Sequence, residues 1–326
     1  MTASPASTAH GRRAGHPASR EPHAPAARQL TRGTQRRDAW FLLVVALTLV
    51  AYARSFTGEF QFDDHSQILD NPAVRDATWR GVLAWGTTRL IPLLTLAANY
   101  RLGGDDPIGY HAVNLIIHLL VAYVVYRLVF ELCQTPRLRR SWMAERPLPL
   151  ALAAALIVAC HPIQVQAVTY VVQRMSTIAA LFYLASVLWY VRARNQAISG
   201  GPSGLAYAAA VLLAVAASLS KENAASLPLA IGLCEWVFFG GADTVGRFLL
   251  RLVPFILIAL AIPITFTLTS DRVWWVPAPQ PTVAGEPHTA DAAAPRATEA
   301  ARPLVRLPGP QPPRADRKNT QPNLIQ

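Results

Sequence analysis

The chain has 326 residues, of which 52% are hydrophobic and only 15% are charged. A soluble domain carries about 25% charged residues, and here the apolar residues gather in long runs, so an ordinary soluble protein is excluded and a membrane protein is indicated. The formal charge of +11 follows the flanks of these runs. That distribution is typical of membrane topology and argues against nucleic acid as a partner.

The apolar runs organise the chain. Residues 1–38 hold seven arginines and have no apolar periodicity, which predicts a disordered basic cytoplasmic tail. Several of the runs that follow are shorter than the roughly 20 residues a bilayer requires, so they must borrow flanking residues. We therefore predict an all-α polytopic membrane domain over residues 39–270, with about seven transmembrane helices. The runs occupy residues 39–53, 111–130, 148–160, 167–191, 205–220, 225–239 and 248–269.

The arginines orient these spans. Basic residues in loops mark the cytoplasmic side, so the N-terminus is predicted in the cytoplasm. The loop 55–110 then lies outside, and it carries seven acidic residues against four basic ones. Residues 271–326 are rich in Pro and Ala without an apolar period, which predicts a second disordered tail.

The outer loop contains the stretch FQFDDHSQILDNP, residues 60–72. Asp63 and Asp64 are adjacent and His65 follows them. In a loop, one carboxylate can face a pocket while its neighbour binds backbone or a cation, which would suit a general base or a metal ligand. The alternative is a solvated loop that closes in an Asx turn at Asp70-Asn71-Pro72.

Further polar residues interrupt the spans, where they are costly and so indicate function. His111, Asn114 and His118 share one helical face, either lining a cavity or bonding to neighbouring helices. Arg174 suits a phosphate, or else it is an arginine at the membrane interface.

Other candidates belong to the outer side as well. Lys221 and Glu222 stand in a short outer turn, as an ion pair or with Lys221 as a second phosphate contact, and His161 precedes Pro162 at another outer turn. Positive and carboxylate side chains that converge on one membrane face favour chemistry on a membrane-embedded anion, such as a lipid-linked phosphate. No Walker loop, GxGxxG, HExxH or Ser-His-Asp pattern is present.

Four segments carry a family resemblance: FDDHSQILDNPAV, IPLLTLAANYRLGGDDPIGYHAVNLIIHLL, HPIQVQAVTYVVQRMSTIAALFYLASVLWY and LSKENAASLPLAIGLCEWVFF. In this order they resemble the membrane half of the tetratricopeptide-repeat O-mannosyltransferases and their bacterial relatives. The resemblance runs from about Trp40 to Phe239. It implies a type C glycosyltransferase fold and location in a bacterial inner membrane.

The resemblance also implies a mechanism. A sugar, mannose by analogy, would pass with inversion from a polyprenyl phosphate to a protein hydroxyl. Asp63 and Asp64 match the catalytic acids, or hold a divalent cation (Mg or Mn) if one is used. Arg174, Lys221 and Arg89 would bind the lipid phosphate. The supporting polar residues would be His65, His111, Asn114, His118, His161 and Glu222.

Relatives in this family continue into further spans and repeats, whereas no 34-residue repeat occurs here. We therefore expect a fold that is incomplete at the C-terminus. The alternatives to an enzyme are a truncated, non-catalytic relative and a small transporter. A transporter would show repeated halves, and the sequence shows no internal repeat.

Overall fold

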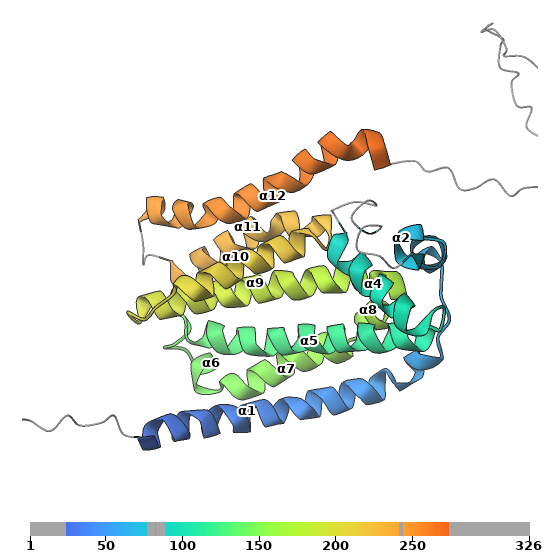
Figure 1. The fold of residues 1–326 in the computed structure, drawn as a ribbon. Helices are drawn as coiled ribbons and strands as arrows, with labels where there is room; N and C mark the ends of the chain where they lie inside the picture. The colour runs from blue at the N-terminus through green and yellow to red at the C-terminus, as the bar shows by residue number, and fades with distance from the viewer. Residues whose placement is uncertain (1–23, 77–81, 83–88, 241–243, 274–326) are drawn as a thin grey trace, which may run out of the picture. The chain divides into compact units, whose positions relative to one another are not determined.

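The computed structural model describes residues 24–76, 82, 89–240 and 244–273. Every described element is helical, which confirms the all-α prediction. Figure 1 shows α1, α7, α5, α9 and α10 side by side, and each neighbouring pair is in contact. The α-helices are α1 (Ala24–Ala51), α2 (Pro72–Arg75), α4 (Leu90–Gly103), α5 (Pro107–Cys133), α6 (Trp142–Glu145), α7 (Pro147–Cys160), α8 (Val165–Thr169), α9 (Arg174–Ile198), α10 (Gly204–Ser218), α11 (Leu227–Cys234) and α12 (Val245–Val273). Short 3-10 turns are η1 (Ala53–Thr57), η3 (Pro162–Gln164), η4 (Val171–Gln173) and η5 (Glu222–Ser226), and π turns are η2 (His65–Leu69) and η6 (Glu235–Phe239).

Each of the seven predicted apolar runs falls in helical segments, but fewer of them span a membrane by length and hydropathy. Within the described residues three helical segments qualify: Arg37–Thr57, Pro107–Cys133 and Val171–Ile198. A fourth qualifies if Pro147–Cys160 and Pro162–Thr169, bent by 50°, count as one span. The protein is an integral membrane protein on this evidence, and the count of seven stays a prediction.

Three elements differ from the predicted boundaries. Helix α1 begins at Ala24, inside the predicted N-terminal tail, whose residues 1–23 lie outside the described residues. Helix α12 reaches Val273, slightly into the predicted C-terminal tail, whose remainder lies outside the described residues. The run 167–191 is not one helix, because the chain turns at Tyr170 between α8 and η4.

Small residues let the long helices approach closely. Ala151, Ala155 and Ala159 lie four residues apart on α7 and are fully buried against α1 and α5. Ala210 and Ala214 do the same on α10, in the cluster that joins α9 to α10. Such stripes are typical of membrane helices, which associate through close packing because lipid offers no hydrophobic driving force.

A buried ionic cluster fixes the C-terminal end of α9. Glu235, at the start of η6, accepts hydrogen bonds from Tyr190, Arg194 and Arg251. These residues come from η6, α9 and α12, so the cluster joins three elements that are distant in sequence. It lies about 20 helical residues, or roughly 30 Å, from the N-terminal end of α9, where the predicted site residues gather.

The predicted outer loop is largely helical. It contains η2, α2 and α4, and the last two pack against each other. The side chain of Asn71 accepts a hydrogen bond of 2.9 Å from the amide of Ala73, and Pro72 opens α2. The Asx turn predicted at LDNP is therefore confirmed. Buried apolar side chains of α2, α4, α5 and η4 pack together beneath this region. Helix α4 contacts the start of α9, and α2 packs against α4 (Figure 1).

Candidate active site

The two adjacent carboxylates have different surroundings. Asp64 is fully buried, and its carboxylate oxygens accept hydrogen bonds from the amides of Gln61 at 3.0 Å and Val172 at 2.7 Å. Asp63 is exposed. The division that the sequence suggested, with one carboxylate bound to backbone and one free for a pocket, is what the structure shows.

The backbone sets this division. Phe62, directly before Asp63, has a φ of +44°, a left-handed conformation that costs a bulky residue about 1–2 kcal/mol. The amide of Asp63 donates to the hydroxyl of Tyr170 at 3.2 Å, and the rings of Phe62 and Tyr170 meet edge to face. Strained residues cluster at functional sites, and this one stands where the chain turns Asp64 inward.

Burial raises the pKa of Asp64, and hydrogen bonds from the amides of Gln61, Val172 and Val171, together with the nearby His111, oppose that rise. The oxygens of this buried carboxylate accept hydrogen bonds from backbone amides, so Asp64 has a structural role. It joins the outer loop to the segment from which α9 begins.

Asp63 lines a cavity of about 210 Å³ together with two of the predicted phosphate-binding residues, Arg89 and Lys221. One carboxylate and two cations from segments distant in sequence thus meet around one space. The other lining residues are Gln67, Val172, Gln173 and Met175. This convergence is the strongest point of agreement with the sequence-based site.

Each of the two cations has a protein partner. Arg89 pairs with Glu222 at 3.3 Å, both side chains being partly exposed. Burial raises the pKa of Glu222, but its own backbone amide, Arg89 and Lys221 outweigh burial and lower the pKa. Lys221 donates to the hydroxyl of Ser176 at 2.7 Å. The predicted pair of Lys221 with Glu222 is therefore replaced by a pair of Arg89 with Glu222.

Arg174 does not reach this cavity. Its guanidinium is fully buried, and it donates to the side chains of Asn114 at 2.7 Å and Asn99 at 2.6 Å. It also donates to the carbonyls of Thr95 at 3.3 Å and Tyr110 at 2.9 Å. This enclosure argues against the prediction that Arg174 binds a lipid phosphate. Arg174 instead ties α4 and α5 to the start of α9.

The predicted histidine stripe bonds to the backbone of neighbouring elements. His111, Asn114 and His118 are buried on one face of α5, and each lies within hydrogen-bonding distance of backbone carbonyls in α7, α8 or η4. Bonding between helices is observed for all three residues, and His118 in addition lines a cavity of about 380 Å³, so both interpretations that the sequence left open apply to it. His161 accepts from the amide of Ile163 and caps η3. His65 is exposed, and it lines neither the cavity of about 210 Å³ nor the one of about 380 Å³.

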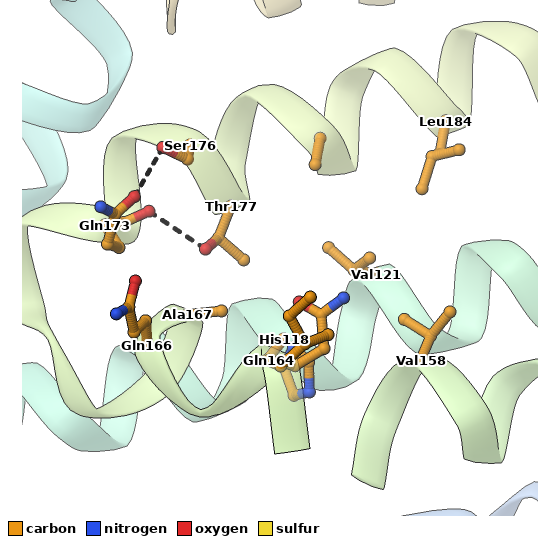
Figure 2. Close-up of a pocket in the computed structure, with 12 residues that line it drawn as sticks. His118, Val121, Val158, Gln164, Gln166, Ala167, Gln173, Ser176, Thr177 and Leu184 are labelled. Atoms are coloured by element: carbon orange, nitrogen blue, oxygen red, sulfur yellow. Dashed lines mark hydrogen bonds between the residues drawn. The ribbon is translucent and has the colours of Figure 1, made fainter. Parts of the chain in front are cut away.

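A second cavity of about 380 Å³ lies between α5, α7, α8 and α9 (Figure 2). Val121, Val158, Ala180 and Leu184 give it apolar walls, and Gln164, Gln166 and Gln173 bring amides to it. Figure 2 shows Gln166 and Gln173 on the same side of the cavity, with Leu184 and Val158 at the other. The cavity is therefore amphipathic, with a polar end that shares Gln173 with the charged cavity.

Comparisons with known proteins identify the lineage. Protein O-mannosyl-transferase TMTC4 of Homo sapiens is 32% identical over 206 residues, covering 56% of this chain and 27% of that protein. Protein O-mannosyl-transferase Tmtc2 of Drosophila melanogaster is 32% identical over 259 residues, covering 74% of this chain and 26% of that protein. The chain is related to the protein O-mannosyl-transferases.

A third relative, protein O-mannosyl-transferase TMTC3 of Homo sapiens, is 30% identical over 208 residues, covering 59% of this chain and 20% of that protein. The chain thus spans about a quarter or less of the length of these O-mannosyl-transferases. No family model matches the chain, and no solved structure matches it.

The charged cavity offers few protein ligands for a divalent cation. Across the described ranges no group of three or more His, Cys, Asp or Glu side chains gathers as a metal site would require. Asp63 shares its cavity with two cations, and both oxygens of Asp64 accept backbone amides.

Sequence reasoning missed Gln173, Ser176 and Tyr170. Gln173 stands beside Arg174. A charged residue in an apolar run is costly and therefore indicates function more strongly than a neutral amide does. The signal that could have found Gln173 and Ser176 is the polar run QRMS itself, in which these two residues are three positions apart and so share a helical face while Arg174 points elsewhere.

Proposed function

We propose that this chain is a membrane glycosyltransferase that moves a mannosyl group from a polyprenyl-phosphate carrier to a protein hydroxyl. The observation that carries the proposal is the cavity in which Asp63 meets Arg89 and Lys221, in a chain related to protein O-mannosyl-transferases. The arrangement supplies a base and two cations, which are the groups such a transfer requires.

The reaction would be a single displacement. Asp63 accepts the proton of the acceptor hydroxyl as its oxygen attacks the anomeric carbon. The bond from that carbon to the phosphate oxygen breaks, and the departing phosphate takes up the bonding electrons. Lys221 and Arg89 stabilise the negative charge that develops there. Attack from the face opposite to the leaving group inverts the anomeric configuration.

The amphipathic cavity of about 380 Å³ suits the lipid part of the donor. Its apolar walls suit an isoprenoid chain, and its polar end adjoins the charged cavity through Gln173. A donor with an apolar tail, an anionic phosphate and a sugar would thus meet matching surfaces in that order. The donor's single phosphate carries one negative charge, which two nearby cations can balance without a metal.

The membrane orientation is part of the proposal. The arginine-rich N-terminus favours the cytoplasm, and this places Asp63 and Lys221 on the outer face, in a type C glycosyltransferase arrangement. A bacterial inner membrane, with a polyprenyl carrier and a protein acceptor on its outer side, is the setting that we propose.

The test is a transfer assay in detergent with radiolabelled polyprenyl-phosphate mannose and candidate acceptor peptides. We expect Asp63→Asn to lower transfer by about 100-fold or more, since a general base contributes roughly that much. Asp70→Asn is the matched control, because Asp70 is exposed and follows η2. No transfer by the wild-type chain with any donor would contradict the enzyme and favour a non-catalytic relative. Full activity of Asp63→Asn would refute the site.

A further inference from the structure

A relay of hydrogen bonds joins the two cavities at the start of α9. Lys221 donates to the Ser176 hydroxyl at 2.7 Å, and that hydroxyl donates to the side-chain oxygen of Gln173 at 2.8 Å. Figure 2 shows the second of these bonds. Gln173 and Ser176 lie where η4 continues into α9, and Lys221 reaches them from the turn before η5, 45 residues away from Ser176 in sequence.

The hydrogen bond from Ser176 to the side-chain oxygen of Gln173 sets the direction of the Gln173 amide. An ammonium group only donates, so Ser176 accepts from Lys221 and keeps its own proton for donation. A carboxamide oxygen only accepts, so that oxygen turns toward Ser176 and the amide nitrogen turns away from it. Figure 2 shows the nitrogen of Gln173 on the far side from Ser176.

Gln173 holds a distinctive place among the lining residues. Of the described residues that line the 380 Å³ and 210 Å³ cavities, Gln173 is the one common to both. One cavity has apolar walls and the other has Asp63, Arg89 and Lys221. Gln173 therefore stands where an amphiphile would change from its apolar chain to its charged head group.

Because Arg174 is enclosed, the polar group at the junction of the two cavities is the uncharged amide of Gln173. The neighbouring guanidinium has its hydrogen bonds inside the protein, so the two adjacent polar residues have separate tasks. Arg174 holds the helices together, and Gln173 presents N–H donors at the junction. Neutral donors that are already oriented bind an anion without the reorganisation that water or a free side chain would need.

We infer that Gln173 binds a phosphate oxygen of the lipid donor through its amide nitrogen, and that Lys221 and Ser176 are positioning residues that orient this amide. The inference rests on the proposed function for the identity of the donor. It adds a neutral phosphate contact that the sequence-based site lacked, and it gives Lys221 a second effect beyond its charge.

The test separates binding of the phosphate from binding of the chain. The probes are a sugar-free polyprenyl phosphate and the polyprenol of the same length, with binding to the full chain in detergent followed by tryptophan fluorescence. We expect Gln173→Glu to weaken polyprenyl phosphate binding by at least 10-fold, because a carboxylate would face the anion, and to leave polyprenol binding unchanged. Gln173→Met should weaken it less, because it removes the donor without adding a charge.

Substitutions of Ser176 test the relay separately. Ser176→Ala should weaken polyprenyl phosphate binding by about 3-fold to 10-fold, and Ser176→Thr should restore it because threonine keeps the hydroxyl. In the transfer assay Ser176→Ala should raise the donor KM and leave kcat nearly unchanged. Ser199→Ala, which removes an exposed hydroxyl at the other end of α9, is the control.

The outcomes distinguish the two proposals. If the wild-type chain binds polyprenyl phosphate with this pattern of variants but transfers no sugar, the proposed function fails and the Gln173 contact stands. If the chain transfers sugar while Gln173→Glu binds polyprenyl phosphate as the wild type does, the inference is overturned. Equal losses for the phosphate and the polyprenol would also overturn it, since they would indicate a general structural defect.

Discussion

The carboxylate of Asp64 accepts a hydrogen bond of 2.7 Å from the backbone amide of Val172. This contact joins the outer loop to the turn from which α9 begins, over a sequence separation of 108 residues. The contact gives Asp64 a structural role, whereas Asp63 lines the cavity with Arg89 and Lys221. Under the proposed function, the stability of the site and its chemistry depend on different carboxylates, and substitutions can separate them.

The first prediction concerns Asp64→Asn. An asparagine keeps one oxygen but replaces the other with a donor, so the amide of Gln61 or Val172 loses its acceptor. A buried amide without a partner costs about 1–3 kcal/mol, and we expect a lower midpoint of thermal unfolding in detergent. Asp63→Asn, in contrast, should unfold as the wild type does. A lower midpoint for Asp63→Asn alone would reverse the two assignments.

The second prediction concerns Arg174→Met. This change leaves the side-chain oxygens of Asn114 and Asn99 without the donor that Arg174 supplies. The carbonyls of Thr95 and Tyr110 lie within α4 and α5, so they lose only a second donor. Since each buried unsatisfied acceptor costs about 1–3 kcal/mol, we expect a loss above about 3 kcal/mol in unfolding free energy, seen as poor recovery of folded protein.

Two further variants sharpen this prediction. Arg174→Lys should recover little of the lost unfolding free energy, because one ammonium cannot replace the planar guanidinium that spans these acceptors. Arg101→Met, at an exposed arginine of α4, should leave stability unchanged. If Arg174→Met folded normally and lost only its response to the lipid phosphate, a phosphate contact would be correct after all.

The sequence predicts the helices and part of the site for clear reasons. An apolar run in a chain with few charges has few alternatives to a helix, and the Asn71-Pro72 pair prescribes its own turn. Asp63 and Lys221 are polar residues beside membrane spans, and the structure places both at one cavity. In these cases the local sequence determines what the residue does.

Arg174 and the α5 histidines show where such reasoning stops. Spacing indicates which face of a helix a residue occupies, but it does not say whether a cavity or another backbone lies opposite. The break at Tyr170 turns the carbonyls of Val168 and Val171 toward Asn114, and no pattern within α5 could indicate this. The partners of a buried polar residue are a property of the tertiary structure.

The third prediction concerns pH and the pair of Arg89 with Glu222. The pKa of Glu222 is lowered in the folded protein from its ordinary value of 4.5. The pair therefore contributes stability above that value, and the contribution is lost as pH falls through the lower folded pKa. Both side chains are partly exposed, so solvent screening limits the contribution to at most about 1 kcal/mol.

The measurement is the difference in unfolding midpoint between the wild type and Glu222→Gln. We expect a small difference at pH 7 that shrinks toward pH 3 and in high salt. Asp64 is present in both proteins, so its pKa, raised by burial, cancels from the comparison. A difference that grew as the pH fell would contradict the pairing.

The last prediction concerns the apolar end of the larger cavity. Ala180 lies on the same face of α9 as Ser176 and Leu184, and these three residues line both the 380 Å³ cavity and a neighbouring cavity of about 310 Å³. A phenylalanine at position 180 would fill space that we assign to the isoprenoid chain. We expect Ala180→Phe to raise the KM for a long-chain donor by about 10-fold and to affect a short-chain donor much less, because the short chain does not reach this depth. Ala197→Phe, at an exposed alanine near the end of α9, is the matched control. Equal effects on both donors would mean that the chain lies elsewhere and that this cavity serves another purpose.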